Sequence, residues 1–308
     1  MGSAEVARVP DFINVGPPRT ATTWLHEVLS GHVGLPLNRK ETNYFTRYYD
    51  NGIEWYRDYF RHCAPGVPIG EISPMYFADD KARERIKEVI PDCKIICSFR
   101  DPVDRAYSQW RLMVRMATTR ASFADAVERH RELRESGRYG TYLAKWYEAF
   151  GRDRVMVLIY EDIVADPQKF LDGVCRFIGI PPIRLEGSRL AKERVNTIPV
   201  APRNPRLARN VRNLLQWLND RRYHRIVQKF RYSRVWRYCF ERGEEFAGPT
   251  PEEDARVRAY YRSEIEALEG LIGRDLSAWK TLRSPEKRNA QETMPAAATV
   301  GAPRRRTI

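Results

Sequence analysis

The sequence predicts a P-loop-like α/β fold of three layers, in which a mostly parallel central sheet is flanked by helices on both faces. The first indication is that short apolar runs alternate with segments whose apolar residues recur at helical spacing. The second is that the first such run leads through a turn rich in proline and threonine directly into a helix. A chain of 308 residues, 43% of them hydrophobic, can bury one large core.

Strands are predicted where apolar and β-branched residues cluster between turn signals. They read FINVG (12–16), PIGEIS (68–73), KIICSF (94–99) and RVMVLIY (154–160). Because helical segments separate them, these strands are expected to run parallel in one sheet.

Three helices have recognisable starts. Asp101 and Asp166 are each followed by a proline, which places an N-cap residue before a proline at the first helical position. Thr250 opens a third helix with a capping box that Glu253 completes, and Gly273 ends it.

The chain reads as one domain over residues 1–283, without internal repeats. Within it, residues 199–248 are basic and helical in pattern. Residues 284–308 are rich in proline, alanine and threonine and lack apolar periodicity, so we expect a tail without fixed structure.

The formal net charge of +13 is concentrated near the C-terminus, and residues 203–242 contain twelve Lys or Arg against two acidic residues. Arginines alternate there with Tyr, Phe and Trp. This pattern is compatible with single-stranded nucleic acid, a membrane surface or a polyanionic substrate. It also suits an amphipathic helix with aromatic residues inside and arginines in water.

The remaining composition favours a cytoplasmic protein without a metal site. The five cysteines are scattered, and none has partners at metal-ligand spacing, so they are interpreted as buried thiols. No window has the ~18 apolar residues of a spanning helix, and the N-terminus has no signal-peptide pattern.

The stretch VGPPRTATTWL departs from an ATP-binding loop at one decisive position. In the frame G-x-x-x-x-G-K-[ST], Gly16 and Thr23 fit, Ala21 stands at the second glycine, and Thr22 replaces the lysine. The first N–H groups of the following helix can still hold a phosphate, and Arg19 adds a fixed charge. We therefore expect phosphate binding without nucleotide–metal chemistry.

PPRTATTWL resembles the 5′-phosphosulfate loop of sulfotransferases, which use 3′-phosphoadenosine 5′-phosphosulfate (PAPS). In this resemblance Arg19 takes the place of a more common lysine, Ala21 replaces a common glycine, and Trp24 falls where cytosolic members stack a ring on adenine. The cofactor-binding residues implied by the loop are Arg19, Thr20, Ala21, Thr22, Thr23 and Trp24.

A second match is CSFRDPVDRAYSQW, in which Arg100 and Ser108 have the spacing of the family's 3′-phosphate site. Arg100 follows a predicted strand, at the edge where open α/β sheets bind ligands. Its guanidinium suits a phosphate dianion, and Ser108 lies about two helical turns further on. Arg105 is one turn before Ser108 on the same helical face.

The candidate base lies in RKETNYF. Heparan-sulfate-type sulfotransferases have a similar KE..(F/Y)F segment with a catalytic glutamate, and Glu41 lies 22 residues after Arg19, as expected there. Lys40 would add positive charge near the sulfonate. Without the resemblance, a solvated charged pair is the favoured interpretation of Lys40 and Glu41. His26 and His32 lack the context of a histidine base, and for His26, on the first predicted helix, a structural role fits better.

The sequence also departs from the heparan branch. Asn43 and Thr46 replace a histidine and an acid, and Ile72 replaces a lysine before the family's TP.YF segment. The Arg-Lys-Gly tripeptide of the family's late basic loop is absent from the sequence. In KERVNTIPVAPRNP, Arg194, Asn196 and Arg203 are the candidate contributors to the cofactor site or a lid.

The resemblance covers roughly residues 12–279 and implies in-line transfer of a sulfuryl group from PAPS to a hydroxyl, with Glu41 as base. The favoured acceptor is a carbohydrate or a secondary metabolite, the nucleotide product is PAP, and no metal is required. A membrane surface could be contacted peripherally, and nucleic acid is not expected. Two alternatives stay open: a P-loop kinase or NTPase, and a non-catalytic polyanion- or nucleic-acid-binding protein using the basic region.

Overall fold

The computed structural model describes residues 8–186, 188, 200–221, 223–231, 233–240 and 244–282. Its central sheet has the order β2-β1-β3-β4, and all neighbouring strands are parallel. The strands are β1 (Phe12–Gly16), β2 (Gly70–Ile72), β3 (Lys94–Phe99) and β4 (Val155–Ile159). The predicted parallel sheet is thus confirmed, and all four carboxyl ends lie at one edge.

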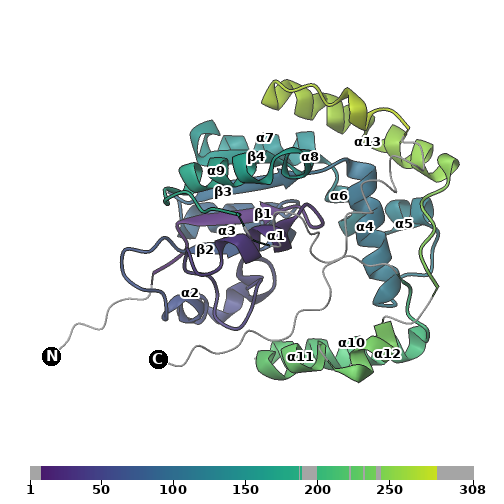
Figure 1. The fold of residues 1–308 in the computed structure, drawn as a ribbon, viewed down its shortest axis with the longest axis horizontal. Coiled ribbons are helices and arrows are strands. Elements are labelled where there is room, and N and C mark those ends of the chain that lie inside the picture. The colour runs from purple at the N-terminus through teal and green to yellow at the C-terminus, as the bar shows by residue number, and fades with distance from the viewer. Residues whose placement is uncertain are drawn as a thin grey trace.

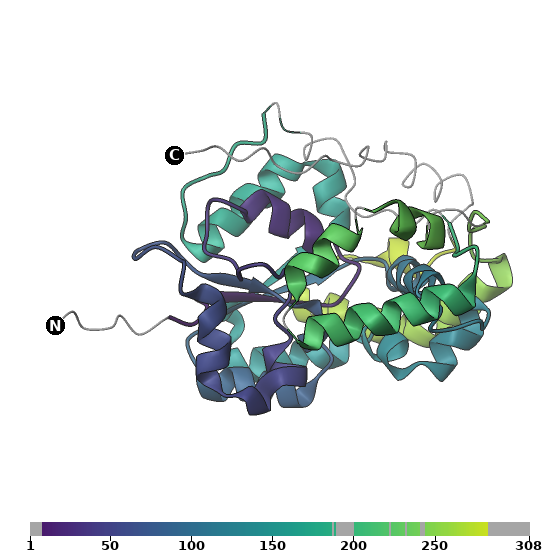
Figure 2. The ribbon, with the colours of Figure 1, turned by 90° about the horizontal axis from the view of Figure 1, so that it is seen from below.

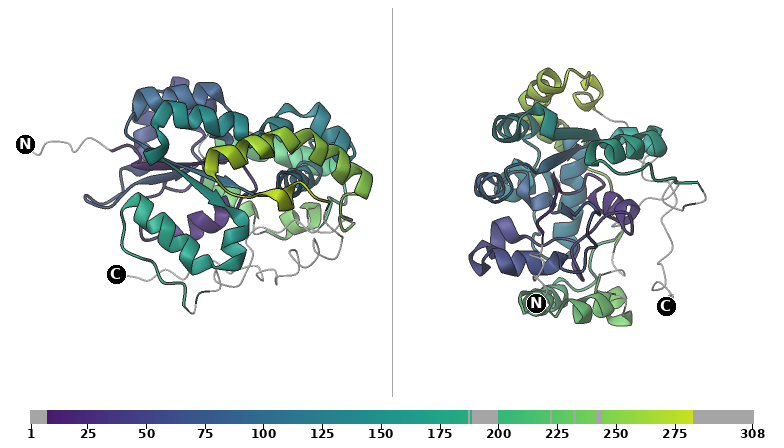
Figure 3. Two further views of the ribbon diagram at one scale, coloured as in Figure 1. Left: turned by 90° about the horizontal axis from the view of Figure 1, so that it is seen from above. Right: turned by 90° about the vertical axis from the view of Figure 1, so that its left-hand side faces the viewer.

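Helices cover both faces of this sheet (Figures 1 and 3). On one face lie α1 (Thr22–Leu29) and α9 (Pro167–Ile178). On the other lie α3 (Asp80–Val89), α7 (Tyr139–Phe150) and α13 (Pro251–Ile272). The right-hand view of Figure 3 shows the sheet between the two helical layers, which confirms the predicted three-layer class.

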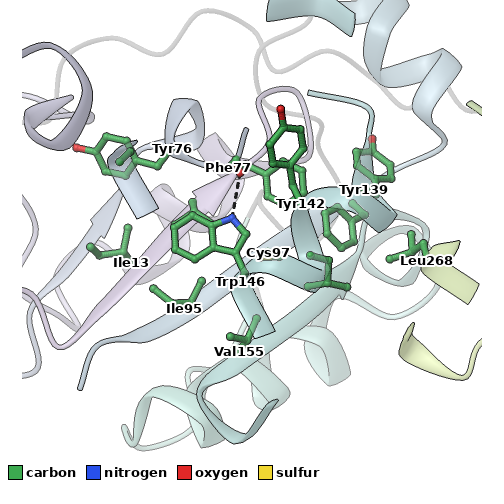
Figure 4. Close-up of a cluster of buried hydrophobic side chains, with 14 of the residues drawn as sticks. Ile13, Tyr76, Phe77, Ile95, Cys97, Tyr139, Tyr142, Trp146, Val155 and Leu268 are labelled. Atoms are coloured by element: carbon green, nitrogen blue, oxygen red, sulfur yellow. Dashed lines mark hydrogen bonds between the residues drawn. The ribbon is translucent and has the colours of Figure 1, made fainter. Parts of the chain in front are cut away.

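Alternating strand residues build a core on each face, because successive side chains of a strand point in opposite directions. Phe12 and Ile96 pack under α1 and α9, whereas Ile13 and Ile95 join the larger core under α7 and α13. In the larger core, the indole N–H of the buried Trp146 donates to the carbonyl of Phe77 over 3.0 Å (Figure 4).

The remaining helices lie around these layers. They are α2 (Ile53–Arg57), α4 (Pro102–Arg115), α5 (Phe123–Arg129), α6 (Arg131–Glu135), α8 (Tyr160–Ala165), α10 (Pro205–Asp220), α11 (His224–Arg231) and α12 (Arg234–Phe240). A π-helical turn, η1 (Tyr44–Tyr48), follows the segment of the candidate base. The sequence reading extended the last strand through Tyr160, but the structure begins α8 at that residue.

The predicted helix caps are confirmed. The carboxylate of Asp101 accepts hydrogen bonds from the first turn of α4, and Asp166 accepts one from the first turn of α9. Thr250 and Glu253 form the reciprocal capping box of α13, and Gly273 follows that helix with a φ of 64°. These local signals specify where three helices begin.

Helix α13 packs closely on α7 and reaches the start of α4. A Cβ on Gly140 of α7 would lie 2.5 Å from the Cβ of Ala267, so the close approach requires glycine. Buried Arg258 of α13 donates to Asp254 over 2.8 Å and to Asp101, the N-cap of α4, over 3.0 Å. It also donates to the carbonyl of Trp279.

The basic region forms the helices α10 to α12, which share a small core with Ala117 after α4. The buried side chains of this core are Ala117, Ala208, Leu215, Val227, Trp236 and Phe240. Some aromatic side chains therefore face inward, as an amphipathic helix requires. Others do not, since Trp217 and Tyr238 are about half exposed. The predicted tail, 284–308, lies outside the described residues.

Two further expectations concern the cysteines and the membrane. Cys93, Cys97 and Cys175 are buried free thiols, and burial raises the pKa of Cys97. Among the helices described, none combines the length and the apolar character needed to cross a membrane.

Candidate functional site

The phosphate-type loop begins where β1 ends, at Gly16. This residue has a φ of 92°, and a Cβ there would lie 2.5 Å from the carbonyl oxygen of Pro74, so both conformation and space require glycine. Asn14 anchors the loop to the sheet. Its side chain accepts from the N–H of Gly16 over 3.0 Å and donates to Ser98 of β3 over 2.9 Å.

Within the loop, Arg19 and Ala21 have left-handed backbone conformations, with φ values of 73° and 65°. At position 21, glycine would adopt that conformation more readily than any residue with a Cβ. The buried hydroxyl of Thr20 donates to the carbonyl of Pro17 over 2.7 Å and so closes the loop on itself. Helix α1 begins at Thr22, so its first N–H groups directly follow the loop.

Lys40 reaches this loop from a separate segment of the chain. Its ammonium nitrogen lies 2.9 Å from the hydroxyl oxygen of Thr23 and 3.4 Å from that of Thr22. The same nitrogen lies 3.6 Å from a carboxylate oxygen of Glu41. Burial lowers the pKa of Lys40, and the neighbouring carboxylate opposes this shift. The structure thus brings the predicted base and the loop to one cation.

Arg19 connects the loop to the second predicted phosphate site. Its Nε donates to the hydroxyl of Ser108 on α4 over 2.9 Å. Burial, together with the charges of Arg111, Arg100 and Arg115, lowers the pKa of Arg19 to about 10. Arg19 is therefore within electrostatic range of three other guanidinium groups, and such positive charge favours an anionic ligand.

Arg100 follows β3 at the same edge of the sheet. Its guanidinium lies 4.7 Å from the ring centre of Tyr160 and 3.9 Å from a carboxylate oxygen of Asp104. Its Nε is buried and has no hydrogen-bond partner among the described residues. A buried donor left in this state costs stability unless a ligand accepts from it, so Arg100 suits a bound phosphate.

Glu161 is a titratable group beside Arg100 that the sequence analysis did not identify. Burial and the charge of Asp101 raise its pKa to about 7, although Arg100 opposes the shift. One carboxylate oxygen of Glu161 accepts from the N–H of Asp101 over 3.2 Å. The sequence offered one indication of Glu161: it lies just after a parallel strand, and ligands of such sheets bind at the carboxyl edge.

A buried carboxylate, Glu71 of β2, supports the segment that carries Glu41. It is fully buried and accepts hydrogen bonds from four hydroxyl groups over 2.5–2.9 Å. The donors are Thr42, Tyr56, Ser73 and Tyr76. Because Thr42 directly follows Glu41, this network holds the candidate base segment against the sheet. Glu71 was not predicted from the sequence, because nothing near an isolated glutamate in a strand indicates which distant hydroxyl groups will bond to it.

Three other residues considered from the sequence, Trp24, Arg105 and His26, pack or form hydrogen bonds within the protein or are buried in it. Trp24 is 5% exposed and packs edge-on against Phe170 at 5.8 Å, so its contact with adenine stays a prediction. Arg105 is fully buried and donates to Gln109 and to the carbonyl of Leu133, both over 2.6 Å. Its guanidinium therefore ties α4 to α6.

The pKa of His26 is lowered to about 4 by burial and by the charge of Lys40. This histidine is therefore neutral at pH 7. Its place on α1 fits the structural role expected from the sequence.

The late basic segment is only partly described. Arg203 is exposed just before α10, and its part in cofactor binding stays a prediction. Arg194 and Asn196 lie outside the described residues. At its far end, α10 is tied to η1 by Asp220, which accepts from Arg47 over 2.8 Å and from the hydroxyl of Tyr48 over 2.6 Å.

Helix α10 also contacts the end of α4, because Arg212 donates to the carbonyl of Met116, the residue after α4, over 3.1 Å. In Figure 2 the green helices accordingly lie across the space between the purple N-terminal segments and the blue α4. Across the described part of the chain, no group of three or more His, Cys, Asp or Glu side chains is placed to hold a metal ion.

The family model for the sulfotransferase domain matches residues 9–198. This segment is more than half of the chain and contains the loop, the candidate base and both residues of the second phosphate site. The chain belongs to the sulfotransferase family. The resemblance inferred from the two motifs is therefore confirmed at the level of the family.

The sulfotransferase has relatives among enzymes named for heparan sulfate. It is 27% identical over 197 residues to mouse bifunctional heparan sulfate N-deacetylase/N-sulfotransferase 4, covering 56% of this chain and 23% of the relative. It is 29% identical over 182 residues to mouse heparan sulfate glucosamine 3-O-sulfotransferase 3B1, covering 56% of this chain and 47% of the relative. The matched segment thus spans less than half of either relative.

A solved structure shares the fold over most of the sulfotransferase. The crystal structure of a sulfotransferase from Alicyclobacillus acidocaldarius superimposes with a TM-score of 0.63 at 21% sequence identity. The match covers 89% of this chain and all of that chain. At this identity the comparison shows the fold.

Proposed function

We propose that this sulfotransferase transfers a sulfuryl group from PAPS to an acceptor hydroxyl. One arrangement carries the proposal: Lys40 contacts both the loop and Glu41, and Arg19 contacts Ser108. The loop, the base and the 3′-phosphate site predicted from the sequence are thereby linked at one edge of the sheet.

The residues at this edge fit the nucleotide part of PAPS. Arg100, with its buried unpartnered Nε, and Ser108 would hold the 3′-phosphate. The backbone and hydroxyls from Thr20 to Thr23 would hold the 5′-phosphate at the start of α1. When bound, PAPS supplies an activated sulfuryl group, and PAP is the nucleotide product. The scheme requires no metal ion.

Glu41 would accept the proton of the acceptor hydroxyl. Its side chain is 33% exposed, so an acceptor can approach it from solvent. Lys40 and Arg19 would stabilise the negative charge that develops on the sulfonate and the leaving oxygen. Because Lys40 contacts both the loop hydroxyls and Glu41, it also sets the distance between phosphate site and base.

We favour a carbohydrate hydroxyl as acceptor, with a secondary metabolite as the other candidate class. The names of the relatives include heparan sulfate, which supports the carbohydrate class. Asn43, Thr46 and Ile72 replace the residues expected of the heparan branch, so we do not extend the proposal to that polymer.

Calorimetric titration with PAP, alongside ATP with Mg²⁺, tests the donor site. We expect micromolar binding of PAP and little binding of ATP. Binding of ATP with Mg²⁺ in preference to PAP would instead support a kinase or NTPase. A non-catalytic polyanion-binding protein would bind polyanions with a steep salt dependence, and this binding would survive loss of Arg19 and Arg100.

Turnover is then measured with PAPS and a panel of carbohydrate and small hydroxyl acceptors. Formation of PAP that depends on an acceptor, together with a sulfated product, would support the transfer. Tight PAP binding without transfer to any carbohydrate, while a small aromatic or aliphatic alcohol is sulfated, would overturn the acceptor class alone.

A further inference from the structure

The segment that carries Glu41 is anchored on both sides of that residue. Before it, the ammonium group of Lys40 lies 2.9 Å from the hydroxyl oxygen of Thr23 in the loop. After it, Thr42 is fully buried, and its hydroxyl donates to a carboxylate oxygen of Glu71 over 2.5 Å. The candidate base, whose side chain is 33% exposed, therefore lies between two residues that are fixed by contacts within the protein.

The hydroxyl of Thr42 also stabilises the turn that follows. Its oxygen accepts from the N–H of Tyr44 over 3.1 Å and lies 3.2 Å from the hydroxyl oxygen of Tyr76. Between Thr42 and Tyr44, Asn43 has a left-handed backbone conformation with a φ of 52°. That conformation costs energy for a residue with a Cβ, although asparagine tolerates it better than most. The hydrogen bond from Tyr44 to Thr42 spans this residue and helps to hold it.

Glu71 is a rigid anchor because hydroxyl groups surround its carboxylate. One oxygen accepts from Tyr56 over 2.5 Å. The other accepts from three hydroxyls over 2.5–2.9 Å, those of Thr42, Ser73 and Tyr76. Burial and the charge of Glu71 raise the pKa values of both tyrosines, so they stay protonated as donors. A buried polar network whose members are satisfied in this way is rigid.

The same end of β2 also supports the phosphate-type loop. The N–H of Ser73 donates to the carbonyl of Asn14 over 3.0 Å, and the N–H of Phe77 donates to that of Val15 over 3.0 Å. Both acceptors belong to the last residues of β1, which lead directly into the loop. Since the hydroxyl of Ser73 is bonded to Glu71, the loop and the base segment are attached to one short stretch of chain.

We propose that Thr42 is a positioning residue for the transfer step: through its bond to Glu71 it fixes Glu41 relative to the loop. This inference rests on the proposed function and adds a residue that touches neither the donor nor the acceptor. A general base must lie within hydrogen-bond reach of the proton that it accepts. Displacement of a reacting group by about 1 Å can lower the rate roughly a hundredfold. The Thr42 hydroxyl should therefore affect kcat and leave nucleotide binding intact.

The test replaces the hydroxyl of Thr42 by a methyl group of similar size. In Thr42→Val we expect kcat, measured with PAPS and the best acceptor of the panel, to fall roughly ten- to hundredfold. The KM for that acceptor and the affinity for PAP should stay within about twofold. Thr42→Ser restores the hydroxyl and should recover most of the rate. The matched control is Thr141→Val, which removes a hydroxyl that donates to Glu264 of α13 over 2.7 Å, and it should keep full activity.

A double substitution distinguishes positioning of the base from a general loosening of the fold. If Thr42 acts through Glu41, adding Thr42→Val to Glu41→Gln should change the residual kcat by less than about twofold. A further fall of roughly tenfold in that background would overturn the inference, because the effect would not depend on the base. A kcat of Thr42→Val equal to that of the unaltered chain would overturn it as well.

Amide hydrogen exchange of the full chain tests the anchor without an acceptor. In Thr42→Val the peptide that contains Tyr44 should exchange faster, because its N–H loses the oxygen that accepts from it. Peptides from β1 and β3 should exchange as before. Unchanged exchange at Tyr44, or faster exchange throughout the sheet, would overturn the inference, since the hydroxyl would then hold either nothing or the whole fold.

Thermal melting checks that each variant is folded. If Thr42→Val does not fold, Tyr76→Phe takes its place, because it removes the hydroxyl beside Thr42 and keeps the ring. We expect this variant to lower kcat without weakening PAP binding, and an unchanged kcat would overturn the inference. Full activity of Glu41→Gln, or the absence of any sulfated product, would instead be a failure of the proposed function.

Discussion

The ammonium group of Lys40 lies 2.9 Å from the hydroxyl oxygen of Thr23, although the two residues are 17 positions apart. In an ATP-binding loop, the lysine directly precedes this Ser or Thr. Here Thr22 stands at that place, and the cation comes from the segment that carries Glu41. The loop therefore keeps a positive charge, but Lys40, the residue directly before the candidate base Glu41, carries it.

This relationship predicts that Lys40 acts mainly on the rate of transfer. Lys40→Met removes the charge and keeps most of the apolar stem, so kcat should fall about a hundredfold, as when one preorganised donor is lost. PAP affinity should weaken less. Steady-state kinetics and calorimetry measure the two effects, and a kcat equal to that of the unaltered enzyme would contradict the assigned role.

Glu41→Gln should abolish proton acceptance while preserving size and polarity. We expect kcat to fall by roughly a hundred- to ten-thousandfold, the range for loss of a general base. The affinity for PAP should change by less than about twofold, because Glu41 is not assigned to the nucleotide. Glu54→Gln, at an exposed carboxylate paired with Arg57, is a control that should stay active. Full activity of Glu41→Gln would rule out this base.

Arg100→Ala should weaken PAP binding by about 1.5–3 kcal/mol, the contribution of a charged hydrogen bond. The loss should be much smaller for adenosine 5′-phosphate, which lacks the 3′-phosphate. Calorimetry with both nucleotides makes the measurement. Arg129→Ala, at an exposed position on α5, serves as the comparison. Unchanged PAP affinity in Arg100→Ala would remove Arg100 from the site.

Glu161 predicts a pH dependence of PAP binding. Its pKa of about 7 in the folded chain is raised from the ordinary 4.5, so the carboxyl gains a negative charge beside Arg100 as pH rises through about 7. That charge opposes an incoming phosphate, and PAP affinity should fall over this interval. Glu161→Gln should remove the part of the pH dependence that comes from this carboxyl group. Comparing the two profiles cancels the ionisation of PAP itself, and identical profiles would contradict the prediction.

The same shift affects the free energy of unfolding. Because folding favours the neutral form of Glu161, its contribution is most favourable below pH 4.5 and declines as pH rises from about 4.5 to about 7. Glu161→Gln should therefore gain stability relative to the unaltered chain at pH 8, and gain less at pH 5. Urea denaturation at the two pH values measures the difference, and an equal change at both would contradict it.

Arg258 lies far from the loop, and we expect its substitution to lower the stability of the fold strongly. Its side chain is about 5% exposed and bonded to Asp101 and Asp254, so Arg258→Met leaves two buried carboxylates without their cation. The free energy of unfolding should fall by about 3–5 kcal/mol. Arg262→Met, on the same helix in an exposed pair with Glu266, should cost less than about 1 kcal/mol. Urea denaturation compares them, and similar losses would refute the argument.

The elements that the sequence predicted well are those specified by neighbouring residues. The apolar runs gave all four strands, and the caps at Asp101, Asp166 and Thr250 gave three helix starts. The element after β4 was missed because Tyr160, an aromatic residue that suits strands, continues the apolar run into α8. Propensity alone does not separate these two states.

The arrangement of the candidate site depends on contacts between distant residues, which periodicity does not encode. Arg19 and Ser108 are 89 positions apart, and the sequence analysis assigned them to different phosphates without indicating their hydrogen bond. Glu71 was overlooked for the same reason. Its role depends on which segments the fold brings to the end of β2, whereas its local sequence contains no distinguishing pattern.

The packing of α13 on α7 determines how short a piece of this chain can fold. The family match stops at residue 198, yet Tyr261 and Leu268 complete the core that Trp146 occupies. A fragment cut at that boundary would expose this apolar surface to water and lose the partner of Asp101 at the start of α4. We therefore expect the smallest piece that folds alone to extend at least to Trp279, and a chain truncated earlier to aggregate.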